Sequence, residues 1–312
     1  MRVAITGASG YIGSLLLQRH VARGDTVHAL VRPVSAMRAE EGVSWFRGDL
    51  ASAERIPPAF FDGVDVLYHC AAELTREPLM QAVNVDGTHT LLAAARGRIR
   101  RWVQVSTVAV YGRHPTAVVT EETPPCPEGA YARSKFDADQ LLMWSATDLN
   151  YTVLRASVVI GPRMRNRAIY ALLEAIHKGI FFLIGQAHAI AHYLHEENLI
   201  DALLLCGSHE NARRRIYNIS QDEPIEDVVA TLAAAIDRAP PRMRVPERVA
   251  RVAAVLAQLT PRFPLTPARI DALTDRTVYA TTRIEHELGY RHRAPIEDAL
   301  RALARSWESS GS

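Results

Sequence analysis

Short apolar runs alternate with longer stretches of helical periodicity through the first half of this chain. Six runs have the length and composition of buried strands, and they cover residues 3–6, 26–31, 43–46, 64–69, 102–106 and 152–155. Two helical stretches, YIGSLLLQRHVARG and VNVDGTHTLLAAARG, end at Gly24 and Gly97, and glycine just past the last turn is a common helix stop. This alternation predicts a parallel sheet with helices on both faces, a doubly wound α/β fold of the Rossmann type.

Shorter elements follow Pro162, with helices expected near residues 170–178 and 197–205 and a strand near 217–219. Two proline-rich connections, PPRMRVP and PRFPLTP, frame the stretch ERVARVAAVLAQL, whose apolar positions recur at helical spacing. We therefore expect residues 1–160 to form a nucleotide-binding domain. Residues 161–312 would form a smaller, mostly helical substrate-binding region, with some elements returning to the first sheet.

Composition narrows the class of protein. The chain has 312 residues, 48% of them hydrophobic, which is enough to bury a large core. A net charge of +2 gives no electrostatic footprint for nucleic acid. Three cysteines without metal-ligand spacing indicate thiols in a reducing compartment, and no apolar run approaches the length that spans a bilayer. With no cleavable leader pattern before the first strand, we expect a cytoplasmic protein without stable membrane insertion.

A glycine-rich segment, TGASGYIG at residues 6–13, follows the first expected strand and opens the first expected helix. That context turns a weak glycine pattern into a nucleotide-binding motif. Gly7 would permit the tight turn, Gly10 would let the backbone approach a pyrophosphate, and Gly13 would let helix and strand pack closely. The helix N-terminus would present N–H groups and a positive dipole end to the phosphates.

The residues after the second and third strands bear on which nicotinamide cofactor fits, because the adenosine ribose lies there in this fold. The second strand ends in HALVRPVS, with Arg32 and no carboxylate. An acidic residue would repel a 2′-phosphate, so this end favours NADP(H) and leaves NAD(H) open; the alternative is an arginine solvated at a strand end. Asp49 in GDL could hold the adenine amino group, or it could be a turn or N-cap aspartate before ASAER.

Lys135 is one of two lysines among 36 basic residues, and it lies in GAYARSKFDAD, four residues after Tyr131. Residues at this spacing share a helix face. An ammonium there would lower the pKa of a phenol, which is normally about 10, and it suits ribose hydroxyls better than a guanidinium does. Ser106 and Thr107 end the fifth strand, at the edge where ligands bind. We infer that the Thr107 hydroxyl holds a substrate oxygen, Tyr131 moves its proton and Lys135 orients the ribose.

These segments together resemble the extended short-chain dehydrogenases/reductases over nearly the whole chain. The shared segments are TGASGYIG, HCAA (69–72), VNVDGT (83–88), STVAVYG (106–112), YARSK (131–135), LRASVVIGP (154–162) and ELGYRHRAPIEDAL (287–300). The resemblance selects Thr107 over Ser106, implies Tyr131 and Lys135 as the acid–base pair, and implies that Asn84 supports a water relay. By itself Asn84 would read as a helix-entry residue.

The resemblance also implies where the cofactor lies. The implied contact residues are Gly7, Ser9, Gly10, Tyr11, Ile12, Gly13, Arg32, Asp49, Leu50, Ala71, Ala72, Tyr131, Lys135, Ser157 and Val158. It further implies a small-molecule substrate, a homodimer and chemistry without a metal.

Two branches of this family are open for the substrate. Residues 160–185 and 245–273 are similar to the C-terminal regions of 3β-hydroxysteroid dehydrogenase-like and dihydroflavonol reductase-like members, which act on apolar or aromatic ketones and alcohols. The alternative is a nucleotide-sugar epimerase or dehydratase with tightly bound NAD. Those members pair an arginine with the nucleotide diphosphate where this chain has Ala191, although Arg163, Arg165 and Arg167 could replace that charge.

A third hypothesis is a nucleotide-sensing scaffold without catalysis, since a fold does not fix a function. The complete set of Thr107, Tyr131 and Lys135 argues against it, because a sensor needs no proton donor. His188, His192 and His195 have spacings that fit one helical face, but the residues between them are apolar or aromatic. We therefore do not expect zinc there.

Overall fold

The computed structural model describes residues 1–35, 39–51, 56–113, 117–145, 148–164, 167–257 and 266–310. Seven strands form its central sheet: β1 (Arg2–Thr6), β2 (Thr26–Val31), β3 (Val43–Arg47), β4 (Val66–His69), β5 (Arg101–Thr107), β7 (Asn150–Ala156) and β11 (Arg215–Ile219). Their order is β11, β7, β5, β4, β1, β2, β3, and every neighbouring pair is parallel. The order runs outward from β1 in both directions, so the predicted doubly wound Rossmann-type sheet is confirmed.

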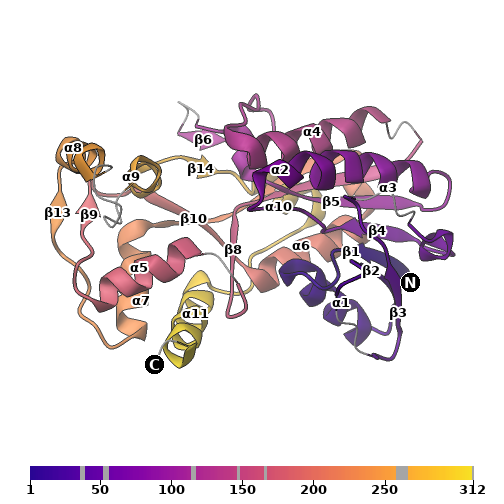
Figure 1. Cartoon of the computed structure of the whole chain (residues 1–312), viewed down its shortest axis with the longest axis horizontal. Coiled ribbons are helices and arrows are strands. Elements are labelled where there is room, and N and C mark those ends of the chain that lie inside the picture. The colour runs from indigo at the N-terminus through magenta and orange to yellow at the C-terminus, as the bar shows by residue number, and fades with distance from the viewer. Residues whose placement is uncertain are drawn as a thin grey trace.

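Helices cover both faces of this sheet (Figure 1). They are α1 (Tyr11–Ala22), η1 (Pro58–Phe61), α2 (Glu77–Met80), η2 (Gln81–Asp86), α3 (Gly87–Ala95), η3 (Val108–Tyr111), α4 (Gly129–Ser145), α6 (Glu196–Ser208), η4 (Glu210–Ala212) and α10 (Thr282–Leu288). Buried side chains of α1, α6 and α10 form a core on one face, and those of η1, α3 and α4 form a core on the other. The helix that leads into α3 is irregular, because η2 is a π-helix, with a wider turn than an α-helix.

A second lobe lies beside the sheet (Figure 1). Its elements are β8 (Val158–Ile160), α5 (Arg167–His177), β9 (Leu183–Ile184), β10 (Ile190–His195), β12 (Gln221–Pro224), α7 (Ile225–Ala235), β13 (Arg244–Val245), α8 (Glu247–Ala257), α9 (Pro267–Thr274) and α11 (Ile296–Ser310). β12, β10 and β8 form a three-stranded sheet, and α5, α7 and α11 bury their apolar faces together. β14 (Val278–Tyr279) leaves this lobe and pairs with β6 (Val118–Val119), so the chain joins the two lobes again.

The elements of the second half lie near the expected stretches: α5, α6 and β11 are found there. β11 pairs with β7 and α6 packs on the first sheet, in keeping with the expectation that some elements return to that sheet. The helix expected to begin with ERVAR is α8, which is described from Glu247 to Ala257. Residues 258–265 lie outside the described residues. A division at residue 160 stays a prediction. No helix within the described ranges is long and apolar enough to cross a membrane.

Candidate active site

The turn between β1 and α1 depends on glycine. Gly7 has φ +65°, and a Cβ there would lie 2.8 Å from the backbone of Ala71, which is half-buried like Ala72 after it. A Cβ on Gly13 would overlap the Gly7 carbonyl oxygen, so α1 approaches the turn only because residue 13 lacks a side chain. Gly10 is the N-cap of α1, and no side chain caps it. The first N–H groups of α1 are thus left for a ligand, and the loop fits a pyrophosphate.

The end of β2 approaches the same loop. Ser35 lies 3.5 Å from the exposed Ser9, measured between their Oγ atoms. Arg32 is exposed, and no ion pair is found for it among the described residues. Asp49 Oδ1 accepts the backbone N–H two residues later at 3.0 Å, as a turn aspartate does, and Leu50 is buried. Arg32 and Ser35 are therefore available at the sheet edge where the adenosine ribose is expected.

β5 and α4 bring the predicted catalytic side chains together. The Thr107 hydroxyl, at the end of β5, lies near enough to the Tyr131 phenol to lower its pKa. Lys135, one turn further along α4, is 4% exposed and donates from Nζ to the Val105 carbonyl oxygen, 2.7 Å away. Ser106 instead donates to Asp139 at 2.8 Å. The choice of Thr107 over Ser106 as the hydroxyl beside Tyr131 thus agrees with the geometry.

Burial dominates the electrostatics of this pair. It raises the pKa of Tyr131 to about 12, with a further increase from the charge of Asp139, while the Thr107 hydroxyl acts in the opposite direction. Burial also lowers the pKa of Lys135, and Asp139 opposes it. In the chain without a cofactor the net shift of the Tyr131 pKa is therefore upward, and a lowering by Lys135 together with an oxidised nicotinamide stays a prediction. At neutral pH Tyr131 keeps its proton and can act as an acid.

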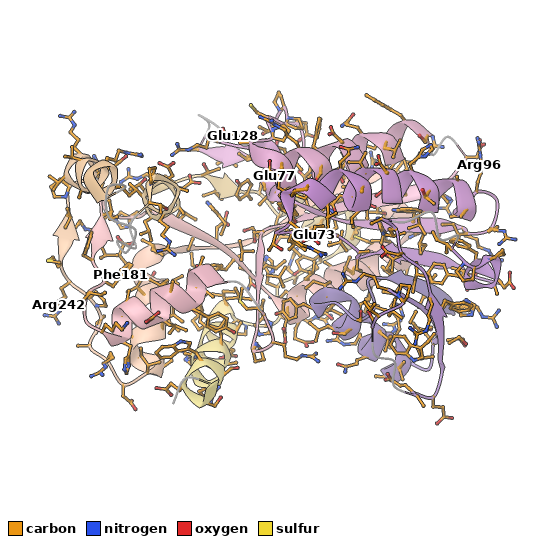
Figure 2. The ribbon with its side chains drawn as sticks, in the orientation of Figure 1. Glu73, Glu77, Arg96, Glu128, Phe181 and Arg242 are labelled. Atoms are coloured by element: carbon orange, nitrogen blue, oxygen red, sulfur yellow. The ribbon has the colours of Figure 1, made fainter. Side chains whose placement is uncertain are left out.

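Asn84 lies in the π-helix and is 2% exposed. Its Oδ1 accepts from the backbone N–H of Glu73 at 2.7 Å, and its Nδ2 donates to the Glu73 carbonyl oxygen at 3.0 Å and to Ser134 Oγ at 2.9 Å. Ser134 donates in turn to the Tyr131 carbonyl oxygen, 2.9 Å away. Asn84 thus fastens the loop at Glu73 to the first turn of α4. Figure 2 shows Glu73 beside α2, far from Arg242 in the second lobe.

The neutral side chain of His69 contacts the segment that contains Asn84 through Thr88. Burial, helped by the charge of Lys135, lowers the pKa of His69 to about 3. The ring lies 2.6 Å from Thr6 Oγ1 through Nδ1 and 3.1 Å from Thr88 Oγ1 through Nε2. Thr88 also donates to the Asn84 carbonyl oxygen at 2.6 Å. The HCAA segment therefore connects β1 to the π-helix through its histidine.

The remaining predicted cofactor residues lie at the start of α1 and directly after β7. Tyr11 and Ile12 are half-buried in the first turn of α1, and the Tyr11 hydroxyl donates to Glu196 at the start of α6. Ser157 is 6% exposed and donates to the Tyr193 carbonyl oxygen at 3.0 Å. Val158, next to it, is 41% exposed. An apolar side chain is thus presented to solvent directly after β7.

Of the residues proposed to anchor a nucleotide diphosphate, the structure describes the side chains of Ala191 and Arg163. Ala191 is 7% exposed within β10. Arg163 donates to Gln18 of α1 at 3.4 Å, Arg165 lies outside the described residues, and Arg167 begins α5. The replacement of the charge absent at position 191 by Arg163, Arg165 and Arg167 therefore stays a prediction.

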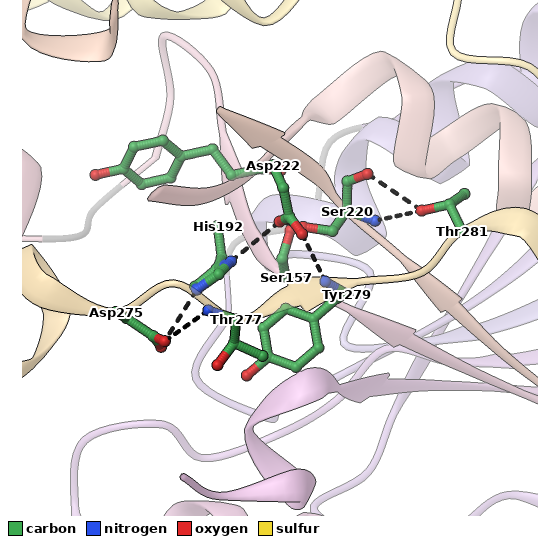
Figure 3. A network of polar contacts seen from close by, with 9 residues as sticks. Ser157, His192, Ser220, Asp222, Asp275, Thr277, Tyr279 and Thr281 are labelled. Atoms are coloured by element: carbon green, nitrogen blue, oxygen red, sulfur yellow. Dashed lines mark hydrogen bonds and ion pairs between the residues drawn. The ribbon is translucent and has the colours of Figure 1, made fainter. Parts of the chain in front are cut away.

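The three histidines also differ from the helical reading. His192 and His195 lie on the strand β10, and His188 precedes it in a left-handed conformation with φ 66°. His192 is held between Asp222 and Asp275, which lie 3.0 and 3.3 Å from its ring nitrogens (Figure 3). In the ranges that the structure describes, no group of three or more His, Cys, Asp or Glu residues could hold a metal ion.

Several residues of the site lie outside the sequence prediction. Ser134 lies within YARSK and Ser35 ends HALVRPVS, but neither serine is assigned a role there, although each contacts a predicted residue. Asp139 lies one turn beyond Lys135, so the spacing that links Tyr131 to Lys135 also leads to it. Arg155, which pairs with Asp139 at 3.3 Å, comes from β7, and no local spacing would have found it.

The comparisons with known proteins place the chain in a family. A model of the NAD dependent epimerase/dehydratase family matches residues 3–220. The chain is 31% identical to the 4-hydroxy-2-methyl-3-oxo-4-farnesyl-3,4-dihydroquinoline-1-oxide ketoreductase of Stigmatella aurantiaca, over 97% of this chain and 96% of that protein. It is 26% identical to the 3 beta-hydroxysteroid dehydrogenase/Delta 5→4-isomerase of Mycobacterium tuberculosis (strain CDC 1551 / Oshkosh), over 96% and 88% of the two chains.

The fold is also found among solved structures. MoeE5 in complex with UDP-glucose and NAD superposes with a TM-score of 0.76 at 22% identity, and both chains are covered over 100% of their length. At that identity the likeness shows the fold alone. From the family model and the full-length relatives, this chain belongs to the NAD dependent epimerase/dehydratase family and is an enzyme of the extended short-chain dehydrogenase/reductase type.

Proposed function

We propose that this enzyme interconverts a ketone and a secondary alcohol, with NADPH as its preferred reductant. The observation that carries the proposal is the placement of the Tyr131 phenol beside Thr107, with Lys135 buried one turn away on α4. A ketoreductase similar over nearly its full length supports the same class of reaction.

The residues of the chain divide the chemistry among them. The hydroxyls of Thr107 and Tyr131 bind the substrate carbonyl oxygen. A bound nicotinamide supplies the hydride. Tyr131 donates its proton to the oxygen as negative charge develops, and its pKa of about 12 keeps that proton in place beforehand. Lys135 provides a positive charge on the same helix face, and Asn84 fixes the adjoining loop.

The preference for NADPH rests on the end of β2. Arg32 is exposed there, and Ser35 lies 3.5 Å from Ser9 of the phosphate loop. A guanidinium and two hydroxyls suit the 2′-phosphate of NADPH. No carboxylate lies in HALVRPVS to accept the ribose hydroxyls of NADH.

The substrate is proposed to be apolar or polycyclic. Val158 is 41% exposed directly after β7, and Leu74 is 62% exposed beside Glu73. Asn84 links Glu73 by hydrogen bonds to α4, the helix that carries Tyr131. Leu74 is the next residue after Glu73, so its exposed side chain belongs to the loop held against that helix. Exposed apolar side chains on the ligand-binding edge of a sheet favour a hydrophobic ligand.

The test is to denature purified protein and identify any released nucleotide by mass spectrometry, while measuring in parallel whether NADPH and NADH bind reversibly. The proposal predicts freely exchanging NADPH that is oxidised on addition of hydrophobic ketones. Tightly retained NAD with no net oxidation would contradict it and would indicate a redox-neutral epimerase or dehydratase.

One observation favours that second function. The second lobe contains a cavity of about 900 Å³ lined by Arg244, Arg248, Arg251 and Arg276, which could receive an anionic sugar nucleotide. However, Arg244 already pairs with Glu226 at 2.6 Å, so part of this charge is neutralised. Thermal stabilisation by UDP-sugars but not by hydrophobic ketones would support the second function over the first.

We also propose the homodimer that the family resemblance implies. Trp144, at the end of α4, is 77% exposed, and an exposed large aromatic side chain favours burial in a protein–protein interface. Light scattering that gives the mass of one chain would contradict the dimer.

A further inference from the structure

Three polar side chains follow one another along α4 at intervals of four residues: Tyr131, Lys135 and Asp139. Lys135 is 4% exposed, and Asp139 is fully buried. A buried ammonium and a buried carboxylate each lose the hydration that stabilises their charge, so the protein must compensate both. The proposed reaction uses Lys135 and gives Asp139 no part.

Asp139 is held from two strands. Its Oδ2 accepts from Ser106 Oγ of β5 at 2.8 Å and from Arg155 Nε of β7 at 3.3 Å. Arg155 is 2% exposed, and it also donates from Nη1 to the Tyr111 hydroxyl at 2.9 Å. Asp139 Oδ1 has no hydrogen-bond partner among the described residues. Burial raises the pKa of this carboxyl, but the permanent charge of Arg155 and the hydroxyl of Ser106 favour its ionised form.

Among the ionisable groups described around Lys135, Asp139 is the one that can carry a negative charge near pH 7. Asp139 has the largest effect of any charged group on the pKa of Lys135 and raises it against burial, and Cys70 acts in the same direction. Burial raises the pKa of Cys70 to about 12, so this thiol is neutral at pH 7. His69, with its pKa lowered to about 3, is neutral as well. From β5, Lys135 meets the uncharged carbonyl of Val105.

We propose that Asp139 is a positioning residue that keeps the buried Lys135 protonated, and that Arg155 supports this role by pairing with the same carboxylate. Without the pair, Lys135 would lose its charge more readily inside the protein, and the helix face of Tyr131 would lose its cation. The consequence for turnover rests on the function proposed above. The effect on Lys135 does not, because it can be measured without substrate.

The chain has only two lysines, so the charge of Lys135 can be followed by NMR. Lys178 has a 58% exposed side chain paired with Glu174, and Lys178→Arg leaves Lys135 as the single lysine and serves as the background. With ¹³Cε-labelled lysine, the Cε shift against pH gives the midpoint of deprotonation. Opposite charges about 6 Å apart, one helical turn, at an effective dielectric of about 20 move a midpoint by about two pH units.

We expect Asp139→Asn to lower the Lys135 midpoint by about one to two pH units, and Arg155→Met to lower it by less, because Asp139 then lacks the charge that favours its ionised form. Because Asp139 is the stronger influence, the double variant Asp139→Asn/Arg155→Met should stay about one pH unit below the background. Ser106→Ala removes a hydrogen bond to Asp139 but no charge, so it should leave the midpoint in place. A merely structural pair would lower the urea midpoint of unfolding without moving the Lys135 titration.

The double variant keeps the test valid if a single variant does not fold, because it removes both members of the buried pair. An unchanged or raised Lys135 midpoint in Asp139→Asn, or in the double variant, would overturn the proposal. A larger decrease in Arg155→Met than in Asp139→Asn would do so too. The two proposals can fail separately: moved midpoints without ketone turnover reject the reaction, and turnover with unmoved midpoints rejects the role of Asp139.

Discussion

His192 is expected to make the stability of this protein depend on pH. The residue lies on β10 between Asp222 and Asp275, at 3.0 and 3.3 Å, and the rings of His192 and Tyr279 pack at 4.8 Å (Figure 3). Burial disfavours the charged imidazole, but the hydrogen bonds and charges of the two aspartates outweigh it and raise the pKa of His192 to about 9. The reference pKa of an unfolded histidine is about 6.5.

The size and sign of the effect follow from that difference. About 2.5 pH units correspond to about 3 kcal/mol at most, and screening at the 38% exposed Asp275 reduces the expected value to about 2 kcal/mol. Because the folded pKa lies above the unfolded one, this stabilisation is complete below about pH 6.5. It is lost as the pH rises through about 9.

The assay compares urea unfolding of the wild type and His192→Gln at pH 6 and pH 10. We expect the variant to be less stable by about 2 kcal/mol at pH 6, and the gap to shrink at pH 10 because the wild-type imidazole is then neutral. The same change at the exposed His177 controls for the loss of an imidazole. A gap of equal size at both pH values, or one that grows at pH 10, would refute the reasoning.

Three further predictions concern the cofactor and the proton. Gly13→Ala should weaken NADPH binding by about tenfold or more, because the added Cβ overlaps the Gly7 carbonyl oxygen. The control Gly24→Ala, whose Cβ meets nothing within 4 Å, should leave NADPH binding unchanged. Calorimetry would measure both affinities. Arg32→Gln should weaken NADPH by about tenfold and leave NADH unchanged, and equal losses for both cofactors would reject the 2′-phosphate role. The kcat/KM for ketone reduction should stay level to about pH 10, because Tyr131 remains protonated until about pH 12; a decline near pH 7 would exclude Tyr131 as the acid.

The central sheet could be predicted because buried parallel strands read as continuous apolar runs between turn residues. The π-helix at Asn84 could not, since Glu73 and Ser134, from other segments, fix the side chain there. At His192 the local spacing misleads. The spacing of the histidines fits a helix, but this segment pairs with β8 and β12 and forms the strand β10. Contacts between distant segments decide both cases.

The catalytic pair could be predicted because a spacing of four residues is local to one helix. The acidity of Tyr131 could not, because the burial that raises its pKa to about 12 is a property of the folded chain. Asp139 stood within reach of the same spacing, while Arg155, from another strand, did not. Local spacing thus predicts the proposed reacting groups, whereas their charge states depend on the folded structure.

The most direct test of the account is whether Tyr131 protonates a substrate oxygen during hydride transfer. NADPH deuterated at C4 would be given with a hydrophobic ketone to the wild type and to Tyr131→Phe, and the alcohol would be examined by mass spectrometry. Tyr170→Phe, which loses a hydroxyl bonded to the Met164 carbonyl in the second lobe, serves as the control. We predict one deuterium per alcohol from the wild type and the control, and a rate lower by about 10²- to 10⁴-fold in Tyr131→Phe at nearly unchanged NADPH affinity. An unlabelled product, or wild-type turnover by Tyr131→Phe, would contradict the account.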